Sequence, residues 1–214
     1  MSLPDPSLLL ARAPVIPVVT VPSAAAGVRL ARALLEGGLP LIEVTLRTPA
    51  AIDAIAAITR EVPDAIVGAG TVTRPELITA AIDAGARFLA TPGTPTRLAE
   101  ALVEAPVPVL PGCATVTEVM VLRELGFPVL NLSPAEALGG AAFIKSLSGP
   151  LPEARFCPSG GVTAENAGRY LALPNVLAVG GSWVAHSEAI ALGDWEQVVA
   201  LAKAAARLHR AFPG

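Results

Sequence analysis

Glu43 and Arg47 are the residues of this 214-residue chain best placed to do chemistry. Glu43 lies inside the apolar run Leu-Ile-Glu-Val-Thr-Leu at residues 41–46. A carboxylate there is either a functional group facing a pocket or half of a buried ion pair, since an unpaired buried charge is costly. Burial raises the pKa of a carboxyl group, which suits it to general acid–base work near neutral pH. The planar fork of Arg47 either binds a substrate carboxylate or pairs with Glu43.

Two pairs of glycines indicate a second kind of chemistry, the binding of an anion. They occur in Pro-Ser-Gly-Gly-Val at residues 158–162 and in Gly-Gly-Ser at residues 180–182. Glycine lets backbone N–H groups approach a phosphate closely, and the N-terminus of a following helix adds a favourable dipole. The alternative is that these glycines only allow tight turns between strands and helices.

The other reactive side chains give weaker signals. Cys113 and Cys157 lie in apolar runs without the spacing of a metal site, which predicts buried free thiols. His209 is expected on a solvated helix, and His186 on the surface or at most at a pocket rim. No cluster of His, Asp or Glu has metal-ligand spacing and no Gly-x-Ser-x-Gly elbow occurs, so neither a metal nor another cofactor is expected.

Short apolar runs alternate with amphipathic segments along the chain, and these elements must position the chemistry. Eight runs rich in Val, Ile and Leu predict strands buried on both faces, at residues 15–20, 41–46, 65–69, 88–91, 107–111, 128–132, 155–158 and 176–180. Helices are predicted at 24–36, 49–61, 75–84, 94–103, 115–125, 163–173 and 195–208, with Thr73 as the N-cap of the third. The pattern predicts one α/β domain over residues 1–214, a (β/α)₈ TIM barrel with a short N-terminal helix.

A doubly wound open sheet is the structural alternative. The count of eight and the absence of a Gly-x-Gly-x-x-Gly motif after the first run favour the barrel. In such barrels the C-terminal ends of the strands form the site, and phosphate often binds after strands seven and eight, where the glycine pairs fall. The run ends carry small polar residues, prolines and glycines, among them Thr71, Pro92, Asn131, Ser133 and Ser159.

Composition excludes several classes of function. Fifteen Lys and Arg against eighteen Asp and Glu give a net charge of −3, which argues against nucleic-acid and anionic-membrane partners. The mean hydropathy of +0.61 is high. Charged, Pro or Gly residues nevertheless interrupt every apolar run well before the ~20 residues that a spanning helix needs. The N-terminus lacks the pattern of a secretory signal, so the cytoplasm is the expected location.

A series of motifs resembles the 2-keto-3-deoxy-6-phosphogluconate / 4-hydroxy-2-oxoglutarate (KDPG/KHG) aldolases. They are VIPVV at 15–19, EVTLRT at 43–48, VGAGTV at 67–72, PG at 111–112, PAE at 134–136, RFCP at 155–158, GG at 160–161 and GGSW at 180–183. The resemblance implies a homotrimeric (β/α)₈ barrel and a class I aldolase that needs no metal. In that reaction a lysine at the end of the sixth strand forms a Schiff base with the substrate's 2-keto group, and cleavage gives pyruvate and an aldehyde.

The resemblance also implies roles for residues of this chain. Glu43 would transfer the proton, and Arg47 and Thr71 would hold the carboxylate end of a small-molecule substrate, pyruvate or a phosphorylated keto acid. Pro92, Ser133 and Ser159 are expected to contact the substrate. The 6-phosphate would be bound by Gly160, Gly161, Gly181 and Ser182.

The departure from the family falls on the Schiff-base position. The family pattern before Pro-Ala-Glu is Lys-Phe-Phe or Lys-Leu-Phe, whereas this chain has Asn131-Leu132-Ser133, and Ser159 replaces a threonine. An amide cannot form an imine because its nitrogen lone pair is delocalised, and neighbours of the wrong chemistry do not replace a covalent nucleophile. The two lysines, Lys145 and Lys203, are expected on helices away from this position.

Three explanations compete. The clustered changes favour an engineered or inactivated aldolase with impaired native activity. A second explanation is a protein that binds keto-acid phosphates without cleaving them. The third is a trimeric scaffold for a designed assembly, in which the changes in the pocket are incidental.

Overall fold

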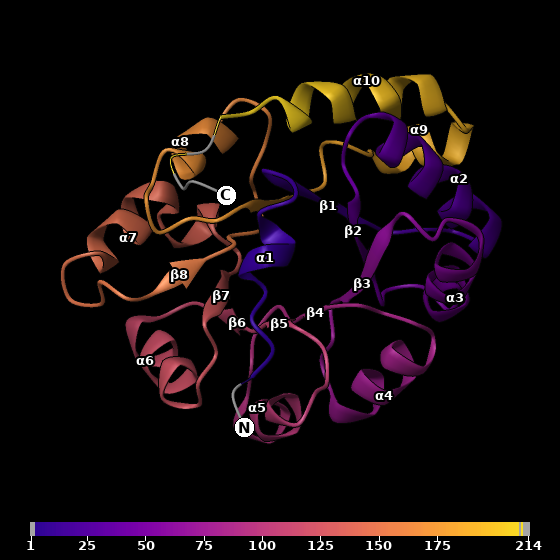
Figure 1. Ribbon diagram of the computed structural model, residues 1–214. Helices are drawn as coiled ribbons and strands as arrows, with labels where there is room; N and C mark the ends of the chain where they lie inside the picture. Colours follow the sequence, from indigo (N-terminus) through magenta and orange to yellow (C-terminus); the bar gives the residue numbers. More distant parts are fainter. Residues whose placement is uncertain (1–2, 210, 212–214) are drawn as a thin grey trace.

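Parallel strands form a closed ring at the centre of the molecule, and helices surround it (Figure 1). The computed structural model describes residues 3–209 and 211. Six strands pair in the order β5-β4-β3-β2-β1-β9, and three pair in the order β6-β7-β8. The strands are β1 (Val15–Val19), β2 (Leu41–Thr45), β3 (Ile66–Gly70), β4 (Leu89–Ala90), β5 (Val109–Leu110), β6 (Gly112–Cys113), β7 (Val129–Leu132), β8 (Arg155–Phe156) and β9 (Val179–Gly181).

Pro111 divides the strand that the sequence predicts at 107–111 into β5 and β6. Proline has no N–H to donate, and the carbonyl of Pro111 accepts a hydrogen bond from the N–H of Asn131 at 2.9 Å. The pairing partner therefore changes at this residue, from β4 before it to β7 after it. At the other seam, the N–H of Gly180 donates to the carbonyl of Pro158 at 2.8 Å. The ring is therefore closed, and β5 with β6 makes one of its eight strands. The predicted (β/α)₈ barrel is confirmed.

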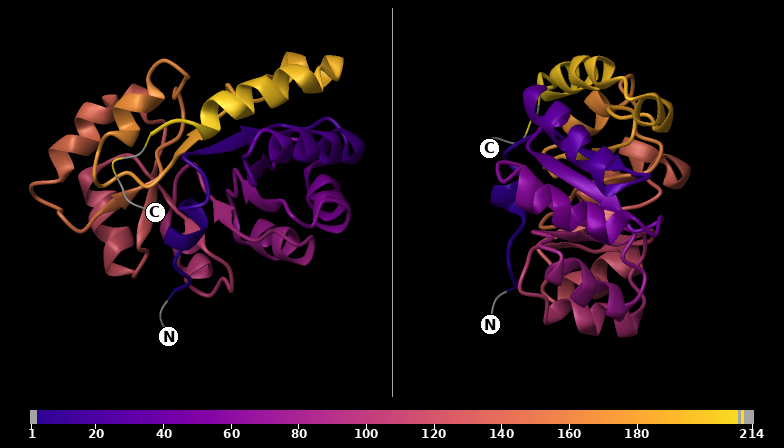
Figure 2. Two further views of the ribbon diagram at one scale, coloured as in Figure 1. Left: turned by 45° about the horizontal axis from the view of Figure 1, so that its top comes forward. Right: turned by 90° about the vertical axis from the view of Figure 1, so that its right-hand side faces the viewer.

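Helices cover the outside of the ring (Figure 2). They are α2 (Ala24–Glu36), α3 (Ala51–Glu61), α4 (Pro75–Asp83), α5 (Thr96–Val103), α6 (Val116–Glu124), α7 (Gly140–Leu147), α8 (Ala167–Leu171), α9 (Ser187–Leu192) and α10 (Trp195–Ala206), with a 3₁₀ turn, η1, at Glu136–Leu138. The predicted N-terminal helix is α1 (Ser7–Leu10), which precedes β1 and lies over the end of the ring where the strands begin (Figure 1). The opposite end of the ring is therefore the one left for a site.

Several helix starts and one N-cap differ from the sequence prediction. Helix α3 begins at Ala51 rather than at residue 49, α5 at Thr96 rather than at residue 94, and α8 at Ala167 rather than at residue 163. Arg74, not Thr73, is the N-cap of α4, because Pro75 takes the first helical position and places the cap on the residue just before it. The predicted helix at 163–173 contracts to α8. There the side chain of Asn166 accepts the N–H of Thr163 at 2.7 Å, which holds residues 163–166 in a turn.

The core is built from small and branched apolar residues on both faces of the strands. Every residue of β3 is buried, and Gly68 leaves room for the ring of Phe88, which a Cβ atom would approach to 2.5 Å. Cys113 and Cys157 are buried free thiols, as predicted. Burial raises the pKa of both thiols, which keeps them protonated and unreactive. The burial of the strands on both faces therefore accounts for the high hydrophobic fraction of the sequence.

Candidate active site

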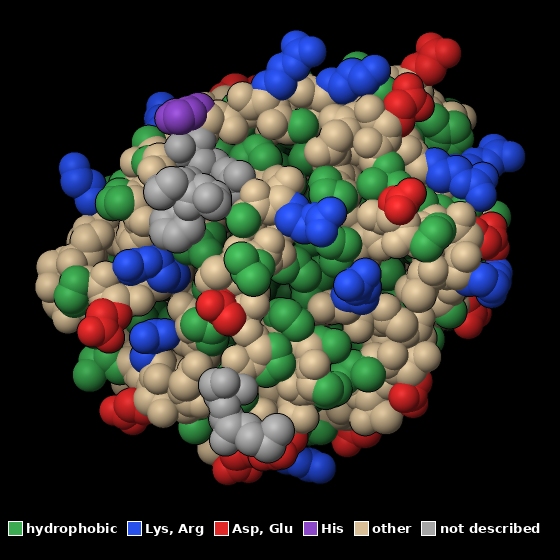
Figure 3. Space-filling model, viewed as in Figure 1, with side chains coloured by type: hydrophobic (Ala, Val, Ile, Leu, Met, Phe, Trp, Pro, Cys, Tyr) green, Lys and Arg blue, Asp and Glu red, His purple; other side chains and the backbone are tan. Residues whose placement is uncertain are grey.

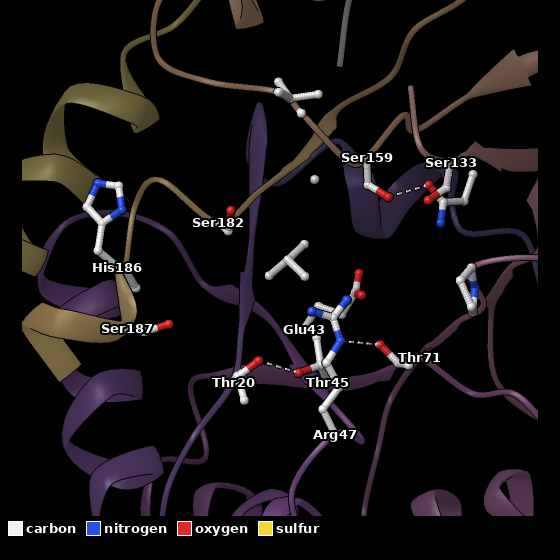
Figure 4. Close-up of a pocket in the computed structure, with 18 residues that line it drawn as sticks. Thr20, Glu43, Thr45, Arg47, Thr71, Ser133, Ser159, Ser182, His186 and Ser187 are labelled. Carbon is white, nitrogen blue, oxygen red and sulfur yellow. Dashed lines mark hydrogen bonds between the residues drawn. The ribbon is translucent and has the colours of Figure 1, made fainter. Parts of the chain in front are cut away.

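A pocket of about 410 Å³ opens at the C-terminal ends of the strands (Figure 4). Among the residues that line it are all of the sequence-predicted site residues except Gly181: Glu43, Arg47, Thr71, Pro92, Asn131, Ser133, Ser159, Gly160, Gly161 and Ser182. Gly180 lines the pocket instead of Gly181. Gly181 is buried against Trp183, whose ring a Cβ atom would approach to 1.8 Å. The strand ends thus bring together residues that are far apart in the sequence.

Glu43 projects into the pocket from the middle of β2. Its strand neighbours in register are Val18 of β1 and Gly68 of β3. Space for the side chain depends on Gly70, where a Cβ atom would lie only 2.0 Å from Oε1 of Glu43. Removal from water raises the pKa of this carboxyl group from 4.5 to about 7, and the nearby charge of Arg47 opposes part of that rise. Glu43 can therefore both accept and donate a proton near neutral pH.

Arg47 lies just beyond β2 and is exposed at the pocket. Its Nε donates to the hydroxyl of Thr71 at 3.3 Å, which leaves the rest of its fork directed toward the pocket (Figure 4). Among the ion pairs of residues 3–209 and 211, none joins a nitrogen of Arg47 to an oxygen of Glu43 within 4.0 Å, so the alternative of a direct ion pair is not realised.

Thr71 holds an unusual backbone conformation at this place. Its φ of 59° lies in the left-handed region, which a β-branched residue seldom adopts. Such strain costs roughly 1–3 kcal/mol and persists where the surrounding structure imposes it, often at binding sites. The strained turn presents the Thr71 hydroxyl to Arg47.

Asn131 is fixed at the end of β7 by two hydrogen bonds. Its Nδ2 donates to the carbonyl of Thr91 at 2.9 Å, and its Oδ1 accepts the hydroxyl of Ser159 at 2.8 Å. The residue is only 6% exposed. A carbonyl can only accept, so the atom that faces Thr91 must be the nitrogen, and this sets the orientation of the amide. One N–H of Nδ2 is left over.

The Ser-Gly-Gly loop after β8 turns its carbonyls away from the pocket. Those of Ser159 and Gly160 accept the N–H groups of Ala135 and Glu136 at 2.8 and 3.1 Å, and that of Gly161 accepts the side chain of Asn166 at 3.0 Å. The φ angles of the two glycines are +89° and +80°. In the described part of the chain neither glycine N–H has a protein acceptor. Consecutive free N–H groups of this kind form a nest for an anion.

Several lining residues were missed or underrated by sequence reasoning. Thr45 donates its hydroxyl proton to the carbonyl of Val19 at 3.0 Å, and its oxygen lies 2.8 Å from the hydroxyl of Thr20. His186, expected mainly as a surface residue, lines the pocket together with Ser187 beside Ser182 (Figure 4). Their position just after β9 was the available signal.

Neither lysine contributes to the pocket. Lys145 is exposed on α7, and Lys203 is exposed on α10. The lining therefore offers a carboxylate, a guanidinium, an imidazole, an amide, hydroxyls and backbone N–H groups, but no primary amine.

The rest of the molecule carries fewer chemical signals. Charged side chains of both signs are scattered over the face that α1 covers (Figure 3). In the described ranges no helix is long and apolar enough to cross a membrane, and no three or more His, Cys, Asp or Glu side chains are grouped as metal ligands. The expected absence of a cofactor and of a nucleic-acid partner stays a prediction.

The fold and site together define a (β/α)₈ barrel with a polar pocket that contains one half-buried carboxylate, Glu43. A family model described as KDPG and KHG aldolase matches residues 7–201. The chain is 43% identical over 197 residues to the KHG/KDPG aldolase of Escherichia coli K12, covering 92% of each chain. The chain belongs to the KDPG and KHG aldolase family, a family of lyases.

Solved structures agree with this assignment. The KDPG aldolase of Legionella pneumophila, with pyruvate captured at low pH as a covalent carbinolamine, matches with a TM-score of 0.92 and 40% identity, over 94% of this chain and 98% of that chain. The 2-keto-3-deoxy-6-phosphogluconate aldolase of Zymomonas mobilis ZM4 with 3-phosphoglycerate matches with a TM-score of 0.88 and 40% identity, over 96% and 97%.

Proposed function

We propose that the pocket binds a 2-keto acid that carries a distal phosphate, and that retro-aldol cleavage is impaired because Asn131 stands at the Schiff-base position. The observation that carries this proposal is the chemistry of the lining. The pocket has a guanidinium, Arg47, and two backbone N–H groups that have no acceptor among the described residues, but it has no lysine amine.

The carboxylate end of the substrate is assigned to Arg47 and Thr71. Arg47 is held at the pocket by its bond to Thr71 and keeps donors free for a bidentate bond to a carboxylate. The Legionella relative holds pyruvate, an acid of this kind.

The phosphate end is assigned to Gly160, Gly161 and Ser182. The carbonyls of this loop already accept hydrogen bonds from other parts of the chain, so its N–H groups are the polar atoms available to the ligand. The Zymomonas relative holds 3-phosphoglycerate, which also carries both a carboxylate and a phosphate. Phosphate binding by Gly181 stays a prediction, since its neighbour Gly180 lines the pocket and Gly181 does not.

The covalent step is tested by trapping. Incubation with pyruvate and borohydride should leave every peptide at its unmodified mass, because no amine lines the pocket. The variant Asn131→Lys, alone or combined with Ser133→Phe, should form the adduct and release pyruvate from the phosphorylated keto acid. A lysine adduct in the parent protein would overturn the proposal, and so would failure of both restored variants to form one.

Binding is tested by calorimetry with pyruvate and with 3-phosphoglycerate as probes. We expect saturable binding of both, and a loss of about tenfold or more in affinity for the Arg47→Ala variant, since a charge-assisted bidentate bond is worth about 1.5–3 kcal/mol. Arg169→Ala, on the exposed side of α8, is the matched control and should bind as the parent does. No binding of either probe would refute this function.

The homotrimer belongs to the same proposal. Helix α6 and its C-cap expose four large apolar side chains, Val116, Met120, Val121 and Leu125, which are 38–48% exposed. An exposed apolar face of this kind is suited to pack against another copy of the chain. Light scattering should give three chains per particle, and fewer for the Met120→Glu/Val121→Glu variant, whereas Leu192→Glu should not change the mass. A particle far larger than a trimer would favour the scaffold alternative, and a monomeric parent would refute the trimer.

A further inference from the structure

We propose that this pocket enolises a bound 2-keto acid without a covalent intermediate. Glu43 removes a proton from C3, and the remaining N–H of Asn131 donates a hydrogen bond to the 2-keto oxygen. The inference rests on the proposed function, because it needs a 2-keto acid held at Arg47. The inference gives Asn131 a role in the reaction, whereas the loss of the lysine by itself indicates only an inactive site.

The two groups face each other across the barrel. Passing round the ring from β2, three strands come before β7 in either direction: β1, β9 and β8 one way, and β3, β4 and the divided strand β5/β6 the other. Both side chains line the same pocket. A flat keto acid between these walls therefore has the base on one side and the amide donor on the other.

The amide of Asn131 is fixed before any ligand arrives. Thr91 holds its nitrogen and Ser159 holds its oxygen, at 2.9 and 2.8 Å. Thr91 is itself held, since its hydroxyl accepts the N–H of Gly112 at 2.7 Å and lies 2.9 Å from the hydroxyl of Thr94. The second N–H of Nδ2 has no acceptor among residues 3–209 and 211, although Asn131 is nearly buried. A fixed donor loses little on reorganisation when charge develops beside it.

The proton transfer balances without any further reactant. The Glu43 carboxylate takes the C3 proton, and the C–H electron pair becomes the C2–C3 π bond. The C2–O π pair moves onto the oxygen, where Asn131 and the charge of Arg47 stabilise it. Return of the proton from Glu43 to C3 restores the keto acid. In deuterium oxide the carboxyl group exchanges its proton with solvent, so that a deuteron returns instead.

A hydrogen bond is a weaker electron sink than a protonated imine, so the reaction is expected to be slow. Removal of one donor to a developing oxyanion costs about 10²–10³-fold in rate in well-studied enzymes. The contribution of Asn131 should fall within that range if its N–H contacts the oxygen.

The reaction is measured as loss of the pyruvate methyl signal by proton NMR in deuterium oxide. The parent protein should exchange the methyl protons faster than buffer, with a rate that rises through about pH 7 as Glu43 loses its proton. The Glu43→Gln variant should lower the rate at least 100-fold. Asn131→Asp replaces the donor by an acceptor of equal size and should lower it by a similar factor. Asn131→Ala covers the case in which the aspartate variant does not fold.

A lysine-free variant separates this route from Schiff-base chemistry. The chain has only two lysines, and both are exposed outside the pocket. The Lys145→Arg/Lys203→Arg variant should exchange pyruvate protons within about twofold of the parent rate. A large loss of exchange in this variant would show that an amine carries the reaction and would overturn the inference.

Calorimetry on the same samples separates the two proposals. Pyruvate binding without exchange above buffer would refute the enolisation and leave the proposed binding function intact. Exchange that is unchanged in Asn131→Asp and Asn131→Ala would also refute the role of the amide. Absence of pyruvate binding would refute the enolisation, and absence of 3-phosphoglycerate binding as well would also refute the proposed function.

Discussion

Replacement of Glu43 by glutamine should stabilise the protein at alkaline pH but much less at acid pH. Burial holds the pKa of this carboxyl group at about 7, above its ordinary value of 4.5. The folded state therefore binds the proton more tightly than the unfolded state does. Below about pH 4.5 the group is neutral in both states and folding carries no penalty. Stability then falls as pH rises toward 7, and above about pH 7 the loss is complete.

The size of this effect follows from the shift. One pKa unit corresponds to about 1.4 kcal/mol, so a rise from 4.5 to about 7 is worth about 3.4 kcal/mol at full ionisation. Part of the penalty is already present at about pH 5, and the side chain retains some exposure to the pocket. The stability advantage of Glu43→Gln over the parent should therefore grow by about 2–3 kcal/mol between about pH 5 and about pH 8.5.

Urea unfolding at these two pH values, at one fixed protein concentration, measures the effect. Glu100→Gln, on the exposed side of α5, is the matched control and should change stability by less than about 0.5 kcal/mol at either pH. An advantage of Glu43→Gln that is equal at the two pH values would refute the reasoning, because it would show that ionisation of Glu43 does not oppose folding. A destabilised variant at about pH 8.5 would refute it as well.

Three further substitutions test the site and its support. Gly70→Ala places a Cβ atom 2.0 Å from Oε1 of Glu43, and it should lower proton exchange at least tenfold while pyruvate still binds in calorimetry. Gly161→Ala, at φ +80°, should weaken 3-phosphoglycerate binding at least tenfold, whereas Gly168→Ala in α8, with open space around it, should bind normally. Tyr170→Phe removes the buried hydroxyl that donates to a carboxylate of η1, and it should lower the free energy of unfolding by about 1–3 kcal/mol in a urea titration. For each substitution, an exchange rate, affinity or free energy of unfolding equal to that of the parent would show that the contact does not have the effect assigned to it.

The fold was predictable because its signals are periodic and local. Each buried strand of the barrel appears in the sequence as a short apolar run, and residues at the ends of these runs come together in one pocket. The break at Pro111 was not predicted, although proline weakens any strand, because the change of pairing partner depends on residues far along the chain. The N-cap of α4 was predicted one residue too early, at Thr73 instead of Arg74, because threonine is a preferred capping residue and arginine is not.

Most of the residues that line the pocket could be predicted from the sequence, but their geometry could not. Glu43 was selected because it is a carboxylate inside an apolar run, and Asn131 because it lies near the end of a predicted strand. The space that Gly70 leaves for Glu43 is a contact between neighbouring strands that the sequence does not specify. The two bonds that fix Asn131 join three different strand ends. The capping box of α6, from Thr115 to Glu118, did have a local signal in its spacing.

The hydrogen bond between Asn131 and Ser159 has a consequence for how such a pocket changes over generations. The two positions are distant in sequence but share one bond, so a substitution at either leaves the other with an unmatched polar group. Their mutational effects should be epistatic, with a coupling of about 0.5–3 kcal/mol in a double-mutant cycle. A lineage that passes between an amine and an amide at position 131 is then expected to change position 159 as well. The order of those two steps would decide which intermediate sequences remain folded and bind substrate.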